Sequence, residues 1–378
     1  MSDKAPDRQD DPPDAGLRGP TIAVPVRRGK KVERIAIFGR PDYLKVEGTA
    51  YDAGHAYGEA MAPFIRYTWR YCQQRVYERS LQKPDLLERL KYLVTETEKR
   101  WPLEVEEIAG IADGAGLDFE QVFLINRHLA STYCSNIGVT HSDIGPVAGG
   151  NLDDPRTYFI KDTHIKGQYR YVSVAWPGVL GCHNGMNEHG LCMMGSAAGA
   201  RFTKMNPLPE FHTDGWNVFS RVLRSCRNVK EGVEFMSNPE ITACGNYLLL
   251  DPSGELVIVE KNGATVISVR RPDEEGFISS VNYFVSECNT EERMMTVDSM
   301  NADRIPAMAR ARKKLNRKNG LEVVKSFLCD TELAGGNTPY PVSSWNTTIS
   351  FIAIPSRLEF LASDGPPHLA GYHKFSLK

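Results

Sequence analysis

The spacing of hydrophobic residues predicts that the first third of the chain is helical. Between residues 49 and 79, apolar side chains recur every three or four positions, as on one face of a helix, and Pro63 is expected to bend or break it. A later helix is expected to begin at Asp118, with Gln121 placed to complete a capping box. The helices predicted after the first cover residues 85–99, 103–115 and 118–130.

After Cys134 the pattern changes to that of β-strands. Short apolar runs predict strands at 169–176 and 190–195. Strong turn residues predict a hairpin at 246–260 and another at 348–362. A third strand at 264–269 is expected beside the first hairpin, and helices are predicted at 216–226, 229–236, 302–315 and 321–328. Hairpins with helices grouped between them indicate the α+β class, with layered sheets.

Composition narrows the picture mainly by exclusion. The 45 Lys+Arg and 47 Asp+Glu residues give a net charge of −2, which argues against a nucleic-acid partner. The sequence has no run of about 18 apolar residues, so no membrane span is predicted. Residues 1–31 are rich in Pro, Asp and Gly and are predicted to be a disordered tail. A short strand is predicted after the tail, at 35–38. The N-terminus lacks the apolar core of a secretory signal, so a cytoplasmic protein is expected.

The common cofactor and metal motifs are missing from the sequence. The eight cysteines include no CxxC pair, and we find no phosphate loop, HExxH, GxSxG or dinucleotide fingerprint. We therefore predict neither a cofactor nor a metal.

The segment from Cys134 to Asp153 carries the strongest candidate chemistry. A helical region ends just before Cys134, and a glycine-rich stretch then returns the chain to Asn151-Leu152-Asp153, which predicts a strand–turn–strand. A cysteine is a useful nucleophile only when a neighbour takes its proton or stabilises its thiolate. A carboxylate alone would raise the thiol pKa, so Asp153 is better placed to orient a cation, either an α-amino group or an arginine. A buried structural cysteine remains the alternative.

Several stretches of the chain resemble, in order, motifs of one enzyme family. They are residues 48–58, 134–135 with 149–153, 185–191, 245–251 with Glu260, 303–304 and 348–375. The family is the acyl-coenzyme A:6-aminopenicillanic acid acyltransferases, relatives of the choloylglycine hydrolases, both of them N-terminal-nucleophile hydrolases. The resemblance implies a four-layer αββα sandwich. It also implies a tail at 1–31, a helical pro-segment or α-chain at 32–133, and a β-chain at 134–378.

Carried over to this sequence, the resemblance implies a nucleophile, Cys134, that becomes N-terminal when the protein cleaves its own Tyr133–Cys134 bond. The freed α-amino group, with an ordinary pKa near 8, is expected to act as general base. Asn246 is expected to donate to the oxyanion, Asp153 to hold the α-ammonium, and Arg304 to complete the charge arrangement. The implied function is cleavage or formation of an amide or thioester bond to an acyl group of a small-molecule substrate.

Four positions depart from the family pattern. Tyr133 replaces the usual glycine before the nucleophile, and Gly150 stands where bile-salt hydrolases have an arginine. Asp303 replaces a serine beside Arg304, and Ala197 lies where relatives often have an asparagine. Two other readings stay open: a Cys-His hydrolase that uses His141 or His183, and a non-catalytic binding or scaffold protein that does not cleave itself.

Overall fold

The structure is a computed structural model that describes residues 41–82, 86–127, 133–154, 156–180, 184–198, 217–286, 301, 303–333 and 341–378. The tail predicted at 1–31 and the strand predicted at 35–38 lie outside the described residues.

Helices dominate the N-terminal part, as the hydrophobic spacing predicted. They follow strand β1 (Tyr43–Gly48) and are α1 (Ala50–Ala60), α2 (Ala62–Gln82), α3 (Leu86–Arg100), α4 (Pro102–Ala115) and α5 (Phe119–Arg127). The helical stretch predicted from 49 to 79 has the expected break, which lies at Met61, two residues before Pro63. Pro63 lies in the first turn of α2, where a missing N–H leaves no helical hydrogen bond unmade. The Asp118 N–H donates to Gln121 Oε1 at 3.0 Å, which confirms one of the two bonds of the predicted capping box.

Two sheets form the rest of the molecule. The eight-stranded sheet has the order β1-β4-β5-β6-β7-β8-β9-β10, and the six-stranded sheet the order β11-β2-β3-β12-β13-β14. The strands of the first are β4 (Phe159–Ile165), β5 (Tyr171–Ala175), β6 (Asn184–Asn187), β7 (Cys192–Ser196), β8 (Ala243–Leu250), β9 (Leu256–Gly263) and β10 (Thr265–Arg270). Those of the second are β2 (Tyr133–Val139), β3 (Val147–Asp153), β11 (Phe277–Ser280), β12 (Thr347–Ile354), β13 (Glu359–Asp364) and β14 (His373–Ser376).

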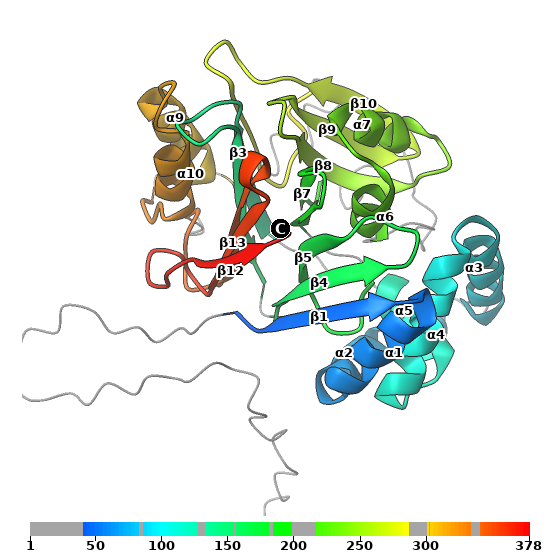
Figure 1. Ribbon diagram of the computed structural model, residues 1–378. Helices are drawn as coiled ribbons and strands as arrows, with labels where there is room; N and C mark the ends of the chain where they lie inside the picture. Colours follow the sequence, from blue (N-terminus) through cyan, green and yellow to red (C-terminus); the bar gives the residue numbers. More distant parts are fainter. Residues whose placement is uncertain are drawn as a thin grey trace, which may run out of the picture.

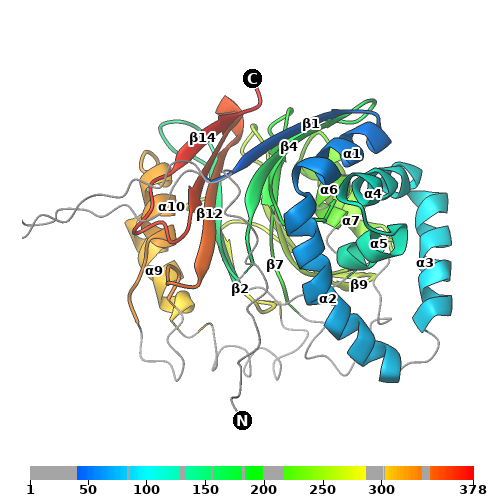
Figure 2. The ribbon, with the colours of Figure 1, turned by 90° about the horizontal axis from the view of Figure 1, so that it is seen from below.

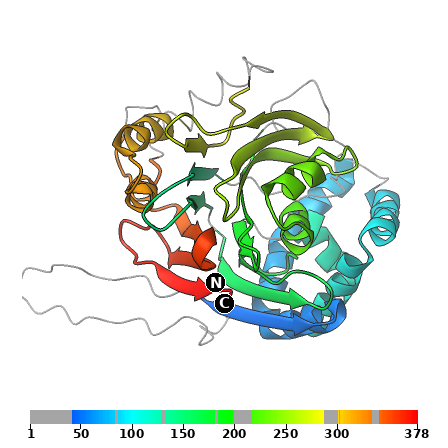
Figure 3. The ribbon, with the colours of Figure 1, turned by 45° about the horizontal axis from the view of Figure 1, so that its top comes forward.

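The sheets pack face to face, with helices on both outer sides (Figures 1 and 2). Helices α9 (Arg304–Lys314) and α10 (Gly320–Leu328) cover the six-stranded sheet, where α10 contacts β2 and β3. Helices α6 (Asn217–Ser225) and α7 (Val229–Ser237) lie with α1–α5 on the outer side of the eight-stranded sheet, as Figure 3 also shows. This arrangement confirms the predicted four-layer αββα sandwich.

Buried charges join the N-terminal helices to the sheets. Glu104 of α4 forms an ion pair with Arg221 of α6 at 2.6 Å. One turn further along α4, Glu107 pairs with Arg224 at 2.6 Å and lies 3.8 Å from the Lys161 ammonium of β4. All five side chains are buried, so these ion pairs lie inside the molecule and not on its surface.

Candidate active site

Cys134 lies near the start of β2, on the face that looks into the space between the sheets. Side chains alternate along a strand, and Gly138, on the same face as Cys134, approaches Leu248 and Leu256 of the opposite sheet. The Cys134 side chain is buried. Strands β2 and β3 pair antiparallel, with Cys134 opposite Leu152, which confirms the predicted strand–turn–strand.

Arg304, the first residue of α9, connects Asp153 to the backbone of Cys134. Its guanidinium forms a buried ion pair with the Asp153 carboxylate and donates from Nη1 to the Cys134 carbonyl at 3.2 Å. Thr347 Oγ1 of β12 donates to the other carboxylate oxygen of Asp153 at 2.5 Å. Burial raises the pKa of Asp153, although the Arg304 guanidinium and the Thr347 hydroxyl lower it in opposition. Three of the four predicted site residues therefore lie in one network.

Asn282 belongs to the same network but was not predicted. Its Oδ1 accepts the backbone N–H of Cys134 at 2.9 Å and lies 3.4 Å from Arg304 Nη1, and its Nδ2 donates to the Ala197 carbonyl at 3.0 Å. The sequence offered only a weak signal: Asn282 follows a short stretch, 277–281, in which three apolar residues are interrupted by two serines. Asparagine is so common in turns that this signal does not separate a site residue from a loop residue.

The strand order explains why side chains hold the backbone of Cys134. Strand β11 pairs with β2 only as far as Ser280, which lies opposite Asn136. Beyond that point no strand of the described residues pairs with this edge of β2, and Asn282 and Arg304 bond the N–H and C=O of Cys134 in its place. Two polar side chains from distant parts of the chain thus act on the peptide groups of one cysteine.

Asn246 of β8 reaches the site through the loop that carries Asn282. Its Nδ2 donates to the carbonyls of Val281 and Tyr283, at 2.8 and 3.0 Å, and lies 3.3 Å from Ser196 Oγ. Its Oδ1 is buried and has no hydrogen-bond partner among the described residues. Asn246 therefore contacts the neighbours of Asn282 and not Cys134 itself.

The departures from the family pattern have structural counterparts. A Cβ at Gly150 would lie 2.3 Å from Asn136 Oδ1 and 2.7 Å from the Phe351 ring, so those two side chains fill the space in which an arginine would start. Ala197 contributes its carbonyl, which accepts from Asn282. Asp303 is buried at the start of α9 and makes no side-chain capping bond there.

Of the two histidines named in the alternative reading, the structure describes only His141, and it does not reach the site. His141 lies beyond the far end of β2, on the order of 20 Å from Cys134 by the rise of a strand. Its ring is hydrogen-bonded to Thr140 Oγ1 at 2.8 Å. His183 lies outside the described residues.

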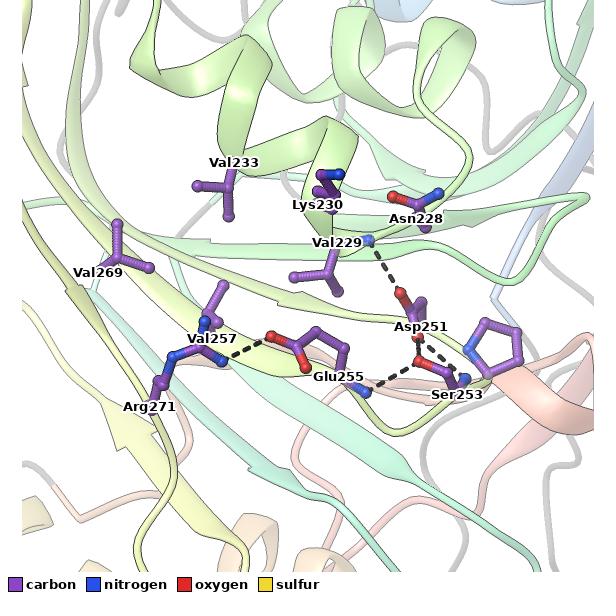
Figure 4. Close-up of a pocket in the computed structure, with 11 residues that line it drawn as sticks. Asn228, Val229, Lys230, Val233, Asp251, Ser253, Glu255, Val257, Val269 and Arg271 are labelled. Carbon is purple, nitrogen blue, oxygen red and sulfur yellow. Dashed lines mark hydrogen bonds and ion pairs between the residues drawn. The ribbon is translucent and has the colours of Figure 1, made fainter.

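A surface cavity of about 730 Å³ lies between α7 and the β8–β9 hairpin (Figure 4), and none of its lining residues belongs to the network around Cys134. Its walls come from α7, the β8–β9 turn, β9 and the edge strand β10, and Val229, Val233, Val257 and Val269 form its apolar side. Asp251 and Glu255 at one end are engaged, the first with the Val229 N–H and the second with Arg271.

The described part of the chain contains neither a cluster of metal ligands nor a helix that could cross a membrane. Within the ranges that the structure describes, no group of three or more His, Cys, Asp or Glu side chains is arranged to hold a metal ion. Over the same part of the chain, none of the helices combines the length and the apolar character that crossing a membrane requires.

Comparison with known proteins gives one family match. A family model described as acyl-coenzyme A:6-aminopenicillanic acid acyl-transferase matches residues 151–357, more than half of the chain. The matched part includes Asp153, Asn246, Asn282 and Arg304 and begins after Cys134. The search of curated proteins returned no match.

Solved structures show more distant similarity. A Caenorhabditis elegans N-acylethanolamine-hydrolyzing acid amidase ortholog shares 16% identity over 59% of this chain and 93% of its own, with a TM-score of 0.43. A mutant conjugated bile acid hydrolase from Clostridium perfringens shares 12% over 65% and 92%, with a TM-score of 0.43. Penicillin V acylase from Agrobacterium tumefaciens shares 13% over 65% and 86%, with a TM-score of 0.41. Similarity at this level does not extend to activity or substrate.

Proposed function

Since the chain belongs to the acyl-coenzyme A:6-aminopenicillanic acid acyl-transferase family, we propose that it cleaves or forms amide bonds through an acyl-enzyme on Cys134. The substrate class that fits the family is a small molecule carrying an acyl group in amide or thioester linkage. The enzyme becomes active when it cleaves its own Tyr133–Cys134 bond, which divides it into an α-chain ending at residue 133 and a β-chain beginning at 134.

The observation that carries this proposal is that two side chains hydrogen-bond the backbone N–H and C=O of Cys134. Any residue buried at this strand edge needs partners for its N–H and C=O, but here the partners are two side chains from distant parts of the chain, and the arginine is also paired with Asp153. The atom that Asn282 holds is the one that would become the α-amino group. The Arg304–Asp153 ion pair lies directly behind it and is fully buried.

In the proposed self-cleavage, the thiol of Cys134 is the nucleophile. Cys134 Sγ attacks the Tyr133 carbonyl carbon, the C–N bond breaks as the C–S bond forms, and the nitrogen takes up the proton. Water then hydrolyses the resulting thioester, leaving a carboxylate on Tyr133 and a free thiol and α-amine on Cys134. The hydrogen bond that this nitrogen donates to Asn282 Oδ1 fixes the orientation of the nitrogen as the peptide bond breaks.

In the processed enzyme the α-amine of Cys134 accepts the thiol proton, because its ordinary pKa near 8 suits a base at neutral pH. The thiolate attacks the substrate carbonyl, the amine or thiol of the substrate leaves with the proton, and an acyl-thioester remains. Water or an acceptor amine then takes the acyl group. Asp153, whose carboxylate is held by Arg304 and Thr347, supplies negative charge near the ammonium. The oxyanion donor implied by the family pattern is Asn246 of β8, whose Nδ2 must release one of the two loop carbonyls that it holds, Val281 or Tyr283, to donate to the oxyanion.

Intact-mass spectrometry of the purified full chain tests the first step. The wild type is expected to give two fragments that break between Tyr133 and Cys134, and Cys134→Ala one chain of 42.2 kDa. Cys192→Ala is the matched control, since Cys192 is also buried between the sheets but lies in β7, and it is expected to cleave normally. A single intact chain in the wild type would remove the α-amine from the mechanism and favour the non-catalytic reading.

A screen of N-acyl amides and acyl thioesters tests the second step. Hydrolysis or transfer by the wild type, abolished in Cys134→Ala and retained in Cys192→Ala, is the expected result. Trapping of the acyl group on the β-chain, seen as a mass increase at Cys134, would identify the acyl-enzyme directly.

A further inference from the structure

The loop that carries Asn282 has no helix or strand of its own to fix its position. We call residues 281–286, which follow β11, the Asn282 segment. Its place must therefore be set by side chains from neighbouring strands. Asn246 does this at the centre, because it donates to the carbonyls of Val281 and Tyr283 on either side of Asn282.

A buried carboxylate holds the far end of the Asn282 segment. Glu260 of β9 lies directly opposite Asn246 in the β8–β9 register and is fully buried. One oxygen accepts the Val285 N–H at 2.9 Å, and the other accepts the Ser286 N–H at 3.0 Å. Such bonds to an ionised carboxylate are stronger than bonds between neutral groups.

Arg270 extends this arrangement to the start of the Asn282 segment. Its Nε lies 2.8 Å from Glu260 Oε1, and its Nη2 donates to the Ser279 carbonyl at 3.0 Å, just before the Asn282 segment begins. Burial lowers the pKa of Arg270, but the ordinary value is so high that the guanidinium stays charged. The Glu260–Arg270 pair therefore holds both ends of the loop.

This pair is better explained by position than by stability. Removing both charges from water offsets most of what their attraction contributes, so buried ion pairs are weak stabilisers. What the pair does provide is a fixed loop backbone on both sides of Asn282. A shift of about 1 Å in a positioned group can reduce a rate by roughly 100-fold.

We propose that Glu260, with Arg270, is a positioning residue of the active site: it fixes the Asn282 segment so that Asn282 Oδ1 holds the nitrogen of Cys134. Glu260 acts through Asn282 and makes no contact with the substrate. The inference rests on the proposed function for its catalytic consequence, whereas the structural part can be tested without activity.

The proposal predicts an effect on the α-amine as well as on the rate. Asn282 Oδ1 can only accept hydrogen bonds at this nitrogen, so it favours the charged ammonium over the amine. Loosening the loop removes that preference and lowers the pKa of the amine. In Glu260→Gln the acid limb of the kcat/KM profile is therefore expected to move to lower pH.

A double-mutant cycle tests the route through Asn282. Glu260→Gln is expected to lower kcat by roughly 10- to 100-fold, with a much smaller change in KM. In an Asn282→Ala background the same substitution is expected to have little further effect, because the positioned group is already gone. Equal losses in both backgrounds would overturn the proposal.

Glu104→Gln is the matched control. Glu104 is a buried carboxylate paired with an arginine, but it lies in α4 within the helical layer. Both variants are expected to lower the melting temperature, and only Glu260→Gln is expected to shift the pH profile. If the control shifts the profile equally, the effect is one of general stability and the proposal fails.

Hydrogen exchange separates this inference from the proposed function. In a Cys134→Ala background, which cannot cleave, the backbone N–H at position 134 is expected to be protected by Asn282. Adding Glu260→Gln is expected to reduce that protection at least about tenfold, whereas adding Glu104→Gln leaves it unchanged. If neither substitution changes the protection of this N–H, Glu260 does not position the Asn282 segment, and the inference is wrong even if the enzyme is active. If Glu260→Gln reduces the protection in a protein that has no activity, Glu260 does position the segment, and only the proposed function is contradicted.

Discussion

Arg304 and Cys134 are 170 residues apart in the chain, yet the guanidinium of the first donates to the carbonyl of the second at 3.2 Å inside a fully buried site. The same guanidinium pairs with Asp153, so one side chain connects the acid of the site to the peptide group of the cysteine. A planar fork of donors can serve both partners at once, and a lysine ammonium cannot do so in the same geometry.

Arg304→Lys should therefore keep the fold and slow the cleavage. The charge beside Asp153 remains, but the donor that holds the Cys134 carbonyl in place is lost, and a shift of about 1 Å in a positioned group can reduce a rate by roughly 100-fold. The half-time for loss of the intact chain, followed by mass spectrometry, gives the rate. Arg310→Lys, in the same helix but partly exposed, is the control, and equal slowing there would mean that the helix and not the donor is responsible.

Gly150→Ala should destabilise the protein by about 1–3 kcal/mol, because an added methyl group overpacks the space between the sheets. It would meet the Asn136 carboxamide at 2.3 Å and the Phe351 ring at 2.7 Å. Urea unfolding measures the difference. Gly371→Ala, where nothing lies within 4 Å of the new Cβ, should be close to neutral. A neutral result at Gly150 would show that Asn136 moves aside freely.

Glu107→Gln should weaken the attachment of the N-terminal helices by about 3–5 kcal/mol, because Arg224 and Lys161 lose the buried charge that they share. In the processed protein the expected readout is separation of the two chains at lower urea, detected by size-exclusion chromatography. Glu106→Gln, on the exposed side of α4, should leave the separation unchanged.

Acid should destabilise the C-terminal region through His368. Burial lowers the pKa of this imidazole in the folded protein, and its Nδ1 lies 2.7 Å from Ser343 Oγ. The unfolded chain therefore binds a proton more readily than the folded protein does. The stability that the neutral imidazole contributes is fully present above about pH 6.5 and is lost as the pH falls through the lower pKa of the folded state. Urea midpoints at pH 7 and pH 5 should converge in His368→Gln, and an unchanged pH dependence would exclude this residue as its source.

The parts of the fold that the sequence predicted well are local. Asp251 and Gly254 mark the turn of the β8–β9 hairpin, and they form a turn in the structure. The return of the chain from Cys134 to Asp153 also depends on one short hairpin. Parallel pairing of β1 with β4, by contrast, joins residues more than 100 positions apart, and no local pattern in Tyr43–Gly48 specifies its partner.

The same distinction applies to the candidate site. Cys134, Asp153 and Arg304 were named from motifs, and the structure brings them together. Asn282 was missed because its role depends on where β11 ends relative to β2, which is a property of the assembled sheet. The oxyanion role predicted for Asn246 stays a prediction.

Strand β1 precedes the proposed cleavage point, yet it lies at the edge of the eight-stranded sheet and pairs with β4 along its whole length. In the proposed two-chain form, the α-chain would therefore stay bound, because it completes the sheet of the β-chain. A gene for residues 134–378 alone would produce a protein with β4 as an open edge, and exposed strand edges promote aggregation. Soluble expression should return when the two pieces are produced together in the same cell, as in fragment complementation.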